Sequence, residues 1–122
     1  PGIPGTEELL PLIYNFGHVS GQLSIGQIVN LLSTGPAKAF GLYPKKGVLQ
    51  EGSDADIVLF DPSEIWTISS ATTHSASHYT PYEGMTVMGR AKMTYLRGRL
   101  IRGHDIYLGL EGDGQFVKAH RD

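Results

Sequence analysis

Two histidines four residues apart are the first residues whose spacing could do chemistry. On a helix, His74 and His78 would share one face and could bind zinc. The serines and threonines around them disfavour a helix, and no third ligand is close in the sequence. A zinc site built from two histidines alone is rare, so we interpret both as polar loop residues.

Three carboxylates could do a second kind of chemistry. Asp54 and Asp56 flank one alanine and could hold a metal ion or share acid–base work. Where a strand begins, however, Asp side chains commonly accept hydrogen bonds from nearby backbone N–H groups, so we predict a turn. Glu83 could be a general acid, but no second carboxylate or base is near it in the sequence. We expect Glu83 to accept backbone N–H bonds in a turn.

The remaining polar residues form no catalytic pattern. Ser33 and Ser75 have no base nearby and no nucleophile signature. Three arginines in a predicted hairpin could form a basic patch, but such side chains more often lie solvated at a sheet edge: Arg97, Arg99 and Arg102. We therefore predict no catalytic residue and no metal ligand in this chain.

The composition is that of a small globular protein. The 122 residues are 40% apolar and 18% charged, which suits one small domain. The net charge is −2 with both signs interspersed, which argues against a nucleic-acid surface. No run of 18 apolar residues gives a membrane signal. The chain has no cysteine, which agrees with a reducing compartment, and we expect a cytoplasmic location.

The part of the chain up to Gly47 is predicted to be helical. Its three expected helices span Glu7–Phe16, Ile25–Leu32 and Pro36–Phe40. Thr6 and Ser24 are the expected N-caps, and Gly17 and Gly41 the expected C-terminal ends.

The part after Gly47 is predicted to be β-rich. The apolar run Ile57–Phe60, between polar turns at 52–56 and 61–62, indicates a short strand buried on both faces. Further extended pieces are expected at 66–68, 86–88, 92–96 and 100–102. Arg97-Gly98-Arg99 joins the last two as a hairpin, and the glycine-rich tail from Gly109 is expected to be irregular.

Several phrases of the sequence resemble a known family. GSDADIVLFD at residues 52–61 resembles the strand that opens the C-terminal β-sandwich of the amidohydrolase superfamily. STGPAKAFGLYPKKG at residues 33–47 resembles a segment of its dihydropyrimidinase and hydantoinase branch. The same order continues in WTIS (66–69), THSA (73–76), YEGM (82–85), LRGR (96–99) and GDGQF (112–116). The resemblance covers nearly the whole chain.

This resemblance implies an α+β fragment. Residues 1–47 would be the last helices of a (β/α)8 TIM-like barrel, and residues 48–122 the strands and irregular tail of the small β-sandwich. The family's ligands for two divalent metal ions, expected to be zinc, would all lie upstream of this sequence. We therefore expect the C-terminal portion of a metal-dependent cyclic amidohydrolase, of hydantoinase or dihydropyrimidinase type, inactive by itself and without a metal ion or other cofactor of its own.

The resemblance also implies a substrate loop. The stretch from Pro1 to Gly5 resembles the loop that lines the family's substrate pocket, so Pro1 and Gly2 are expected near substrate. Pro1 stands where dihydropyrimidinases commonly have an asparagine, which leaves hydantoin, dihydropyrimidine, allantoin and dihydroorotate types open as the cyclic amide.

Two other functions stay open. The chain could be the tail of a non-catalytic scaffold with the amidohydrolase fold, or a standalone binding module. We also expect self-association through an apolar helical face that a barrel would otherwise cover: Leu9, Leu12, Ile13, Ile28 and Leu32.

Overall fold

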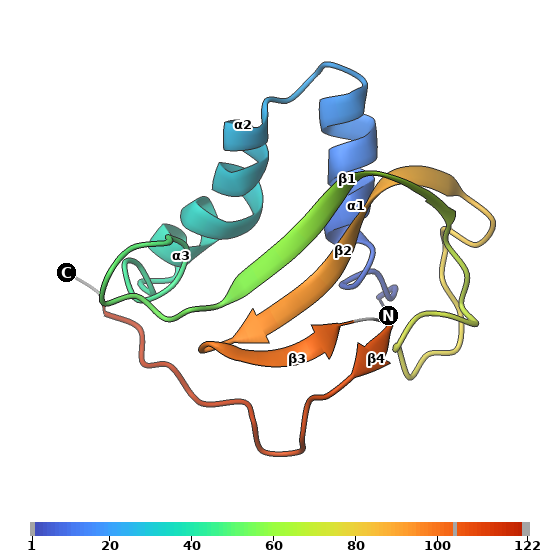
Figure 1. Cartoon of the computed structure of the whole chain (residues 1–122). Helices are drawn as coiled ribbons and strands as arrows, with labels where there is room; N and C mark the ends of the chain where they lie inside the picture. The colour runs from blue at the N-terminus through green and yellow to red at the C-terminus, as the bar shows by residue number, and fades with distance from the viewer. Residues whose placement is uncertain (1, 104, 121–122) are drawn as a thin grey trace. The chain divides into compact units, whose positions relative to one another are not determined.

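The computed structural model describes residues 2–103 and 105–120, with helices first and strands after them (Figure 1). The helical elements are α1 (Leu9–Ile13), η1 (Tyr14–Val19), α2 (Ile25–Val29), η2 (Asn30–Thr34) and α3 (Gly35–Ala39). The strands are β1 (Ile57–Thr67), β2 (Thr86–Leu96), β3 (Arg99–Gly103) and β4 (Ile106–Tyr107), hydrogen-bonded in that order as one sheet.

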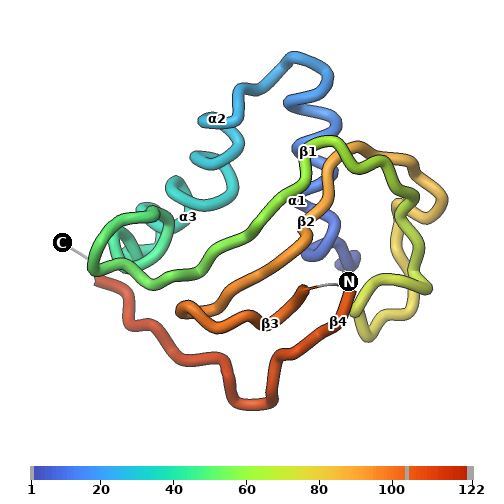
Figure 2. The backbone as a smooth tube through the Cα atoms, in the orientation of Figure 1, coloured from blue at the N-terminus to red at the C-terminus, as the bar shows by residue number. Residues whose placement is uncertain are grey.

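The chain forms two compact units, and each draws on two separate stretches of sequence. The first unit combines Pro1–Ser24 with Asp61–Arg90, and the second combines Ile25–Phe60 with Ala91–Asp122. The backbone trace in Figure 2 lets the reader follow β1 and β2, each of which contributes residues to both units.

The first helix is longer than predicted at its C-terminal end. The helical backbone of α1 continues without a break into η1, a π-helical segment that ends at Val19. Gly17 is therefore not a cap, and a Cβ atom there would lie 2.6 Å from Leu23 Cδ1. Glycine at this position makes room for Leu23, and the positive φ of +79° belongs to Gly21 instead.

The start of this helix also differs from the prediction. The residue before α1 is Glu8 rather than Thr6, and its side chain makes no capping hydrogen bond. Pro11 is the third residue of α1, in the first turn, where the missing N–H has no partner within the helix to lose.

The second and third predicted helices are one continuous helical segment. The elements α2, η2 and α3 follow one another from Ile25 to Ala39, and both Thr34 and Gly35 have helical dihedral angles. A Cβ atom on Gly35 would lie 2.6 Å from the carbonyl oxygen of Asn30, so glycine permits this close turn just before Pro36. Gly41, with φ at +67°, follows the end of the helix as predicted.

Strand β1 corrects the predicted short buried strand. It runs from Ile57 through Asp61 and Pro62 to Thr67, so the expected turn at 61–62 is absent. Val58 and Leu59 are 45% and 48% exposed, so the apolar run is not covered on both faces by the described residues. β1 is at the edge of the sheet, where a proline need not interrupt a hydrogen-bonded ladder.

The hairpin prediction is confirmed. β2 and β3 pair antiparallel up to Leu96 opposite Arg99. The two residues between them, Arg97 and Gly98, have φ of +47° and +82°, and two positive φ angles are what a type I′ turn requires. The predicted pieces 86–88 and 92–96 are joined in one strand, and the described residues after β4 form no further strand up to residue 120.

The buried side chains differ from the predicted apolar face. Ile68 and Val87 are almost fully buried in the first unit, and Ile28 is only 5% exposed in the second. The predicted apolar face is mostly covered. Leu9 is exposed, whereas Leu12, Ile13 and Leu32 are half-buried. The exposed apolar residues of the helices are instead Leu9, Phe16, Val19, Ile25, Val29 and Leu31. Within the described residues, no helix has both the length and the apolar character needed to cross a membrane.

Candidate functional site

The N-terminal loop, residues 2–8, contains the described part of the Pro1–Gly5 stretch that was expected to line a substrate pocket. Pro1 lies outside the described residues. Gly2 is exposed, has φ at +127°, and would have nothing within 4 Å of an added Cβ atom. This dihedral angle is one that glycine adopts readily and L side chains rarely do. Because Gly2 is exposed and has no side chain, its backbone N–H and C=O groups are accessible from outside the chain.

Glu7 ties the N-terminal loop to a second loop far along the chain. Its Oε2 accepts a hydrogen bond from the backbone N–H of His74 at 2.8 Å, and its Oε1 lies 3.0 Å from Nδ1 of the His74 ring. Both carboxylate oxygens of one side chain therefore contact one residue. Sequence reasoning missed this pair, because its members are 67 positions apart and carry no short-range signal.

The second loop, residues 69–84, is closed at its base. The N–H of Ile68 donates to the carbonyl of Met85 at 2.9 Å, and the N–H of Gly84 donates to the carbonyl of Ile68 at 2.9 Å. Glu83 accepts the N–H of Ser70 at 2.6 Å. This backbone hydrogen bond, with help from the hydroxyls of Ser69 and Ser70, lowers the pKa of Glu83. The predicted structural role of Glu83 is confirmed.

Further contacts hold the N-terminal loop and the first helix in the first unit. A Cβ atom on Gly5 would be 3.7 Å from the ring of Tyr82, so the loop backbone lies close to that ring. The hydroxyl of Thr80, a buried residue, accepts the N–H of Tyr82 at 3.2 Å. In η1, Oδ1 of Asn15 accepts the N–H of Met88 at 2.9 Å.

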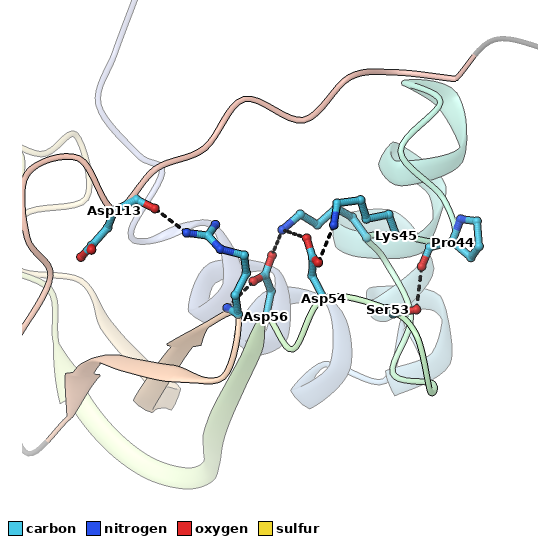
Figure 3. A network of polar contacts seen from close by, with 8 residues as sticks. Pro44, Lys45, Ser53, Asp54, Asp56 and Asp113 are labelled. Carbon is cyan, nitrogen blue, oxygen red and sulfur yellow. Dashed lines mark hydrogen bonds and ion pairs between the residues drawn. The ribbon is translucent and has the colours of Figure 1, made fainter.

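Asp54 and Asp56 belong to an ion-pair cluster in the second unit (Figure 3). Lys45 Nζ is 2.7 Å from Asp54 Oδ1, Lys46 Nζ is 2.8 Å from Asp54 Oδ2, and Lys46 also pairs with Asp56. Asp56 accepts the backbone N–H of Arg97 at 2.8 Å. Hydrogen bonds from Lys45 and then Lys46 lower the pKa of Asp54 to about 2. Ammonium groups thus contact the oxygens that a metal ion would need.

The turn prediction for these two aspartates is therefore only half right. The N–H of Asp56 does donate to the carbonyl of Asp54 at 2.9 Å, which is a local turn. The side chains, however, bind the ammonium groups of Lys45 and Lys46, and the one backbone N–H that Asp56 accepts belongs to Arg97, 41 positions away. Two adjacent lysines are followed, nine or ten positions later, by two aspartates, and this charge pattern could have predicted the pairing.

The hairpin arginines are paired rather than simply solvated, which corrects that prediction. Arg97 donates to the carbonyl of Asp113, and Arg99 pairs with the Asp113 carboxylate. Arg102 donates to the carbonyl of Ala91 and reaches Asp105. The pKa of Asp113 is lowered mainly by the hydrogen bond from the backbone N–H of Leu110, and further by the guanidinium of Arg99. The contacts of Arg97 and Arg99 with Asp113 attach the irregular tail to the hairpin.

Histidines and carboxylates of the described residues do not converge on one point. Across residues 2–103 and 105–120, no three His, Cys, Asp or Glu side chains are grouped so that they could hold a metal ion. The ring of His74 faces Glu7, and His78 sits at a positive φ of 56° in the 69–84 loop.

Comparison with known proteins finds close relatives. The model of the amidohydrolase family matches residues 7–101. The chain is 43% identical to a D-hydantoinase of Rhizobium radiobacter over 120 residues, which are 98% of this chain and 26% of the relative. It is 39% identical to a D-hydantoinase of Geobacillus stearothermophilus over 117 residues, 96% of this chain and 25% of the relative.

Solved structures agree with these sequence relatives. A D-hydantoinase structure matches with a TM-score of 0.94 at 43% identity, over 98% of this chain and 26% of that chain. The L-hydantoinase (dihydropyrimidinase) from Arthrobacter aurescens matches with a TM-score of 0.91 at 37% identity, over 95% of this chain and 26% of that chain. The chain thus spans about a quarter of the length of the relatives it matches.

Proposed function

The chain belongs to the amidohydrolase family, and we propose that it is the C-terminal portion of a hydrolase that opens the amide bond of a cyclic amide. The observation that carries this proposal is the match to hydantoinases along 98% of the chain, at 43% identity and a TM-score of 0.94. Relatives named D-hydantoinase, L-hydantoinase and dihydropyrimidinase favour a hydantoin or dihydropyrimidine type of substrate.

The proposed whole protein has a barrel and a small sandwich. In this proposal residues 1–47 belong to the barrel and residues 48–122 to the sandwich. The order of elements supports it, because the described helices all lie before residue 40 and the described strands all begin after residue 56. The two compact units are contact clusters within this chain, and the boundary at 47/48 stays a prediction about the larger protein.

The proposed role of this chain in the reaction is to shape one wall of the substrate pocket. Pro1 and Gly2 would lie near the cyclic amide. The exposed backbone of Gly2, with no side chain beside it, supports this role because a backbone N–H or C=O can pair with a ring amide. No residue of this chain is proposed as a catalytic acid, base or nucleophile.

Two divalent metal ions, proposed to be zinc, would be held by residues outside this chain. The described residues contain no three-ligand group, so they do not fit a role as the metal site. When bound, such ions supply an activated water and polarise the amide carbonyl. The 122-residue chain is accordingly proposed to be inactive by itself. Its cytoplasmic location and its self-association likewise stay predictions.

The test begins with the intact polypeptide that carries this sequence. Its mass is measured first, and the purified protein is then assayed for ring opening of hydantoin and dihydrouracil, before and after chelation and metal reloading. We expect a polypeptide several times heavier than the 13.2 kDa chain, with hydrolysis that chelation abolishes and reloading restores. The 122-residue chain with the same metals is the control and should be inactive. A heavy protein that binds no metal and opens neither ring would support the scaffold alternative, and a 13.2 kDa species would support a binding module.

A further inference from the structure

We propose that Glu7 is a positioning residue, which holds the N-terminal loop in place by clamping it to the 69–84 loop through His74. This inference rests on the proposed function, because it assigns the contact a role in substrate binding. Glu7 lies five positions after Gly2, the described residue proposed to approach the substrate. It touches neither substrate nor reacting atoms in this proposal and acts through the loop backbone.

The geometry of the contact favours a clamp over an incidental surface pair. A surface pair commonly joins two long, mobile side chains. Here one partner is a backbone N–H, which cannot rotate away from the carboxylate as a side chain can. The second carboxylate oxygen meets Nδ1 of the same residue at 3.0 Å, so the Glu7 carboxylate is held at both oxygens.

Both partners are themselves anchored. On one side, Glu7 is followed by the buried Glu8, whose carbonyl accepts the N–H of Leu12 at 3.0 Å and so fixes the loop to the start of α1. On the other side, the 69–84 loop is closed by hydrogen bonds between Ile68 and both Gly84 and Met85. The clamp therefore joins the 69–84 loop, which is closed at its base, to the N-terminal loop, which is held at its end next to α1.

A second contact point makes the loop position specific. Gly5 lies against the ring of Tyr82, which also belongs to the 69–84 loop. With Glu7 and Gly5 both held by the same partner loop, the free part of the N-terminal loop is reduced to the few residues before Gly5. Without the Glu7 contact, the loop would keep its attachment at Glu8 and the contact of Gly5 with Tyr82, but the segment between them would no longer be bound to the 69–84 loop. We expect the residues before Gly5, including Gly2, to become less well positioned as a result.

The experiment uses the full-length polypeptide that carries this chain, with four single variants. Glu7→Ala removes both acceptors, Glu7→Gln keeps one acceptor oxygen, and His74→Ala keeps the backbone N–H but removes the ring. Glu51→Gln is the matched control, because it removes the same charge from an exposed residue of the second unit. Each variant is measured for kcat, KM, metal content and backbone amide hydrogen exchange.

We expect Glu7→Ala to raise KM about tenfold with kcat changed less, since misplacing a substrate-positioning group by about 1 Å can cost up to about 100-fold. Glu7→Gln and His74→Ala should fall between Glu7→Ala and the parent. Metal content should be unchanged, and amide exchange should quicken in both loops. The Glu51→Gln control should stay within about twofold of the parent. A merely structural role would change the melting temperature without this separation of KM from kcat.

Two results would overturn the inference: a KM for Glu7→Ala within about twofold of the parent, or unchanged amide exchange in both loops. If the unaltered protein opens no cyclic amide, the proposed function fails by itself. Hydrogen exchange then tests the clamp independently of activity. Faster exchange of both loops in Glu7→Ala but not in Glu51→Gln would support the clamp, and equal exchange in the two variants would overturn it.

Discussion

Replacing Gly47 by alanine should destabilise the second unit through two separable effects. The first is conformational, since Gly47 has φ at +83°, a left-handed conformation that costs an L residue about 1–2 kcal/mol. The second is steric, because the new Cβ atom would lie 2.5 Å from Cβ of Ala37 and 3.1 Å from the carbonyl oxygen of Ser33. Ala37 is buried and its Cβ is the first atom of its side chain, so it can yield only if the backbone of α3 moves.

The steric effect has a magnitude of its own. Overpacking of this kind typically costs about 1–3 kcal/mol, so Gly47→Ala should lose roughly 2–5 kcal/mol in total. Gly52→Ala is the matched control, because Gly52 has nearly the same φ, +87°, and nothing within 4 Å of its added Cβ atom. The control should lose only the conformational part, about 1–2 kcal/mol. The two variants should therefore differ by about 1–3 kcal/mol.

Urea unfolding followed by circular dichroism measures this difference, with the free energy of unfolding extrapolated linearly to water. The reasoning is refuted if Gly47→Ala is no less stable than Gly52→Ala, because the contact with Ala37 would then carry no energy. A control as stable as the parent would instead refute the conformational part. The hydrogen bond from the Thr34 hydroxyl to the Gly47 carbonyl is 2.6 Å long. We expect this distance to increase in Gly47→Ala if the backbone moves.

Three further predictions follow from single contacts. Asn15→Ala should cost about 1–3 kcal/mol, since it leaves the part-buried N–H of Met88 without its acceptor, whereas Asn15→Asp keeps an acceptor and should cost less in the same urea assay. The pKa of Asp54 is lower in the folded chain than its ordinary 3.8, so its contribution to stability is full above about pH 4 and is lost as the pH falls towards about 2. Unfolding curves recorded between pH 5 and pH 2 measure this loss of stability. In Lys46→Gln, NMR titration should show a higher pKa for the Asp54 carboxyl than in the parent, and an unchanged pKa would contradict the pairing. Mixed with zinc and then desalted, the 122-residue chain should retain less than one equivalent by elemental analysis, since its described residues offer no three-ligand group, and one retained equivalent would contradict this.

Local patterns in the sequence predicted local structure well. The β2–β3 hairpin could be predicted because a turn containing Gly98 separates two runs of apolar, β-branched or aromatic residues, 92–96 and 100–102. Gly41 could be predicted as a helix end because glycine readily adopts the positive φ that is common just past a helix C-terminus. Membership of the family could be predicted from the order of short sequence segments between residues 33 and 116. The family match confirms it.

The errors arose where a residue's usual preference is overridden by its surroundings. Gly17 was predicted as a helix end, but its lack of a Cβ atom serves the packing of Leu23. Asp61-Pro62 was predicted as a turn, but an edge strand accommodates it. Neither outcome can be derived from the flanking residues, since both depend on which segment packs alongside.

The candidate site was predictable only in part. Glu83 was correctly interpreted as an acceptor of backbone N–H bonds, whereas the expected position of Gly2 near substrate stays a prediction. The clamp between Glu7 and His74 was not predictable, because local patterns carry no information on which of several polar loop residues meet across the chain. The pairing of Asp54 and Asp56 with Lys45 and Lys46 was within reach of charge patterning, but it was interpreted as a local turn.

The alternation of the two compact units along the chain has a consequence for biosynthesis. The first unit needs residues as far as Arg90, and the second needs the stretch that begins at Ala91. Ribosomes synthesise about 5–20 residues per second. The segment from α2 to α3 is therefore made before residues 61–90, and several seconds pass between the synthesis of α1 and that of its partner segment in the first unit. Throughout this interval the nascent chain would hold Tyr14, whose hydroxyl donates to the Pro62 carbonyl of β1 in the folded chain, without that partner. Chaperone occupancy on the ribosome should accordingly persist until the end of β2 has emerged and should decline only as the hairpin and tail follow.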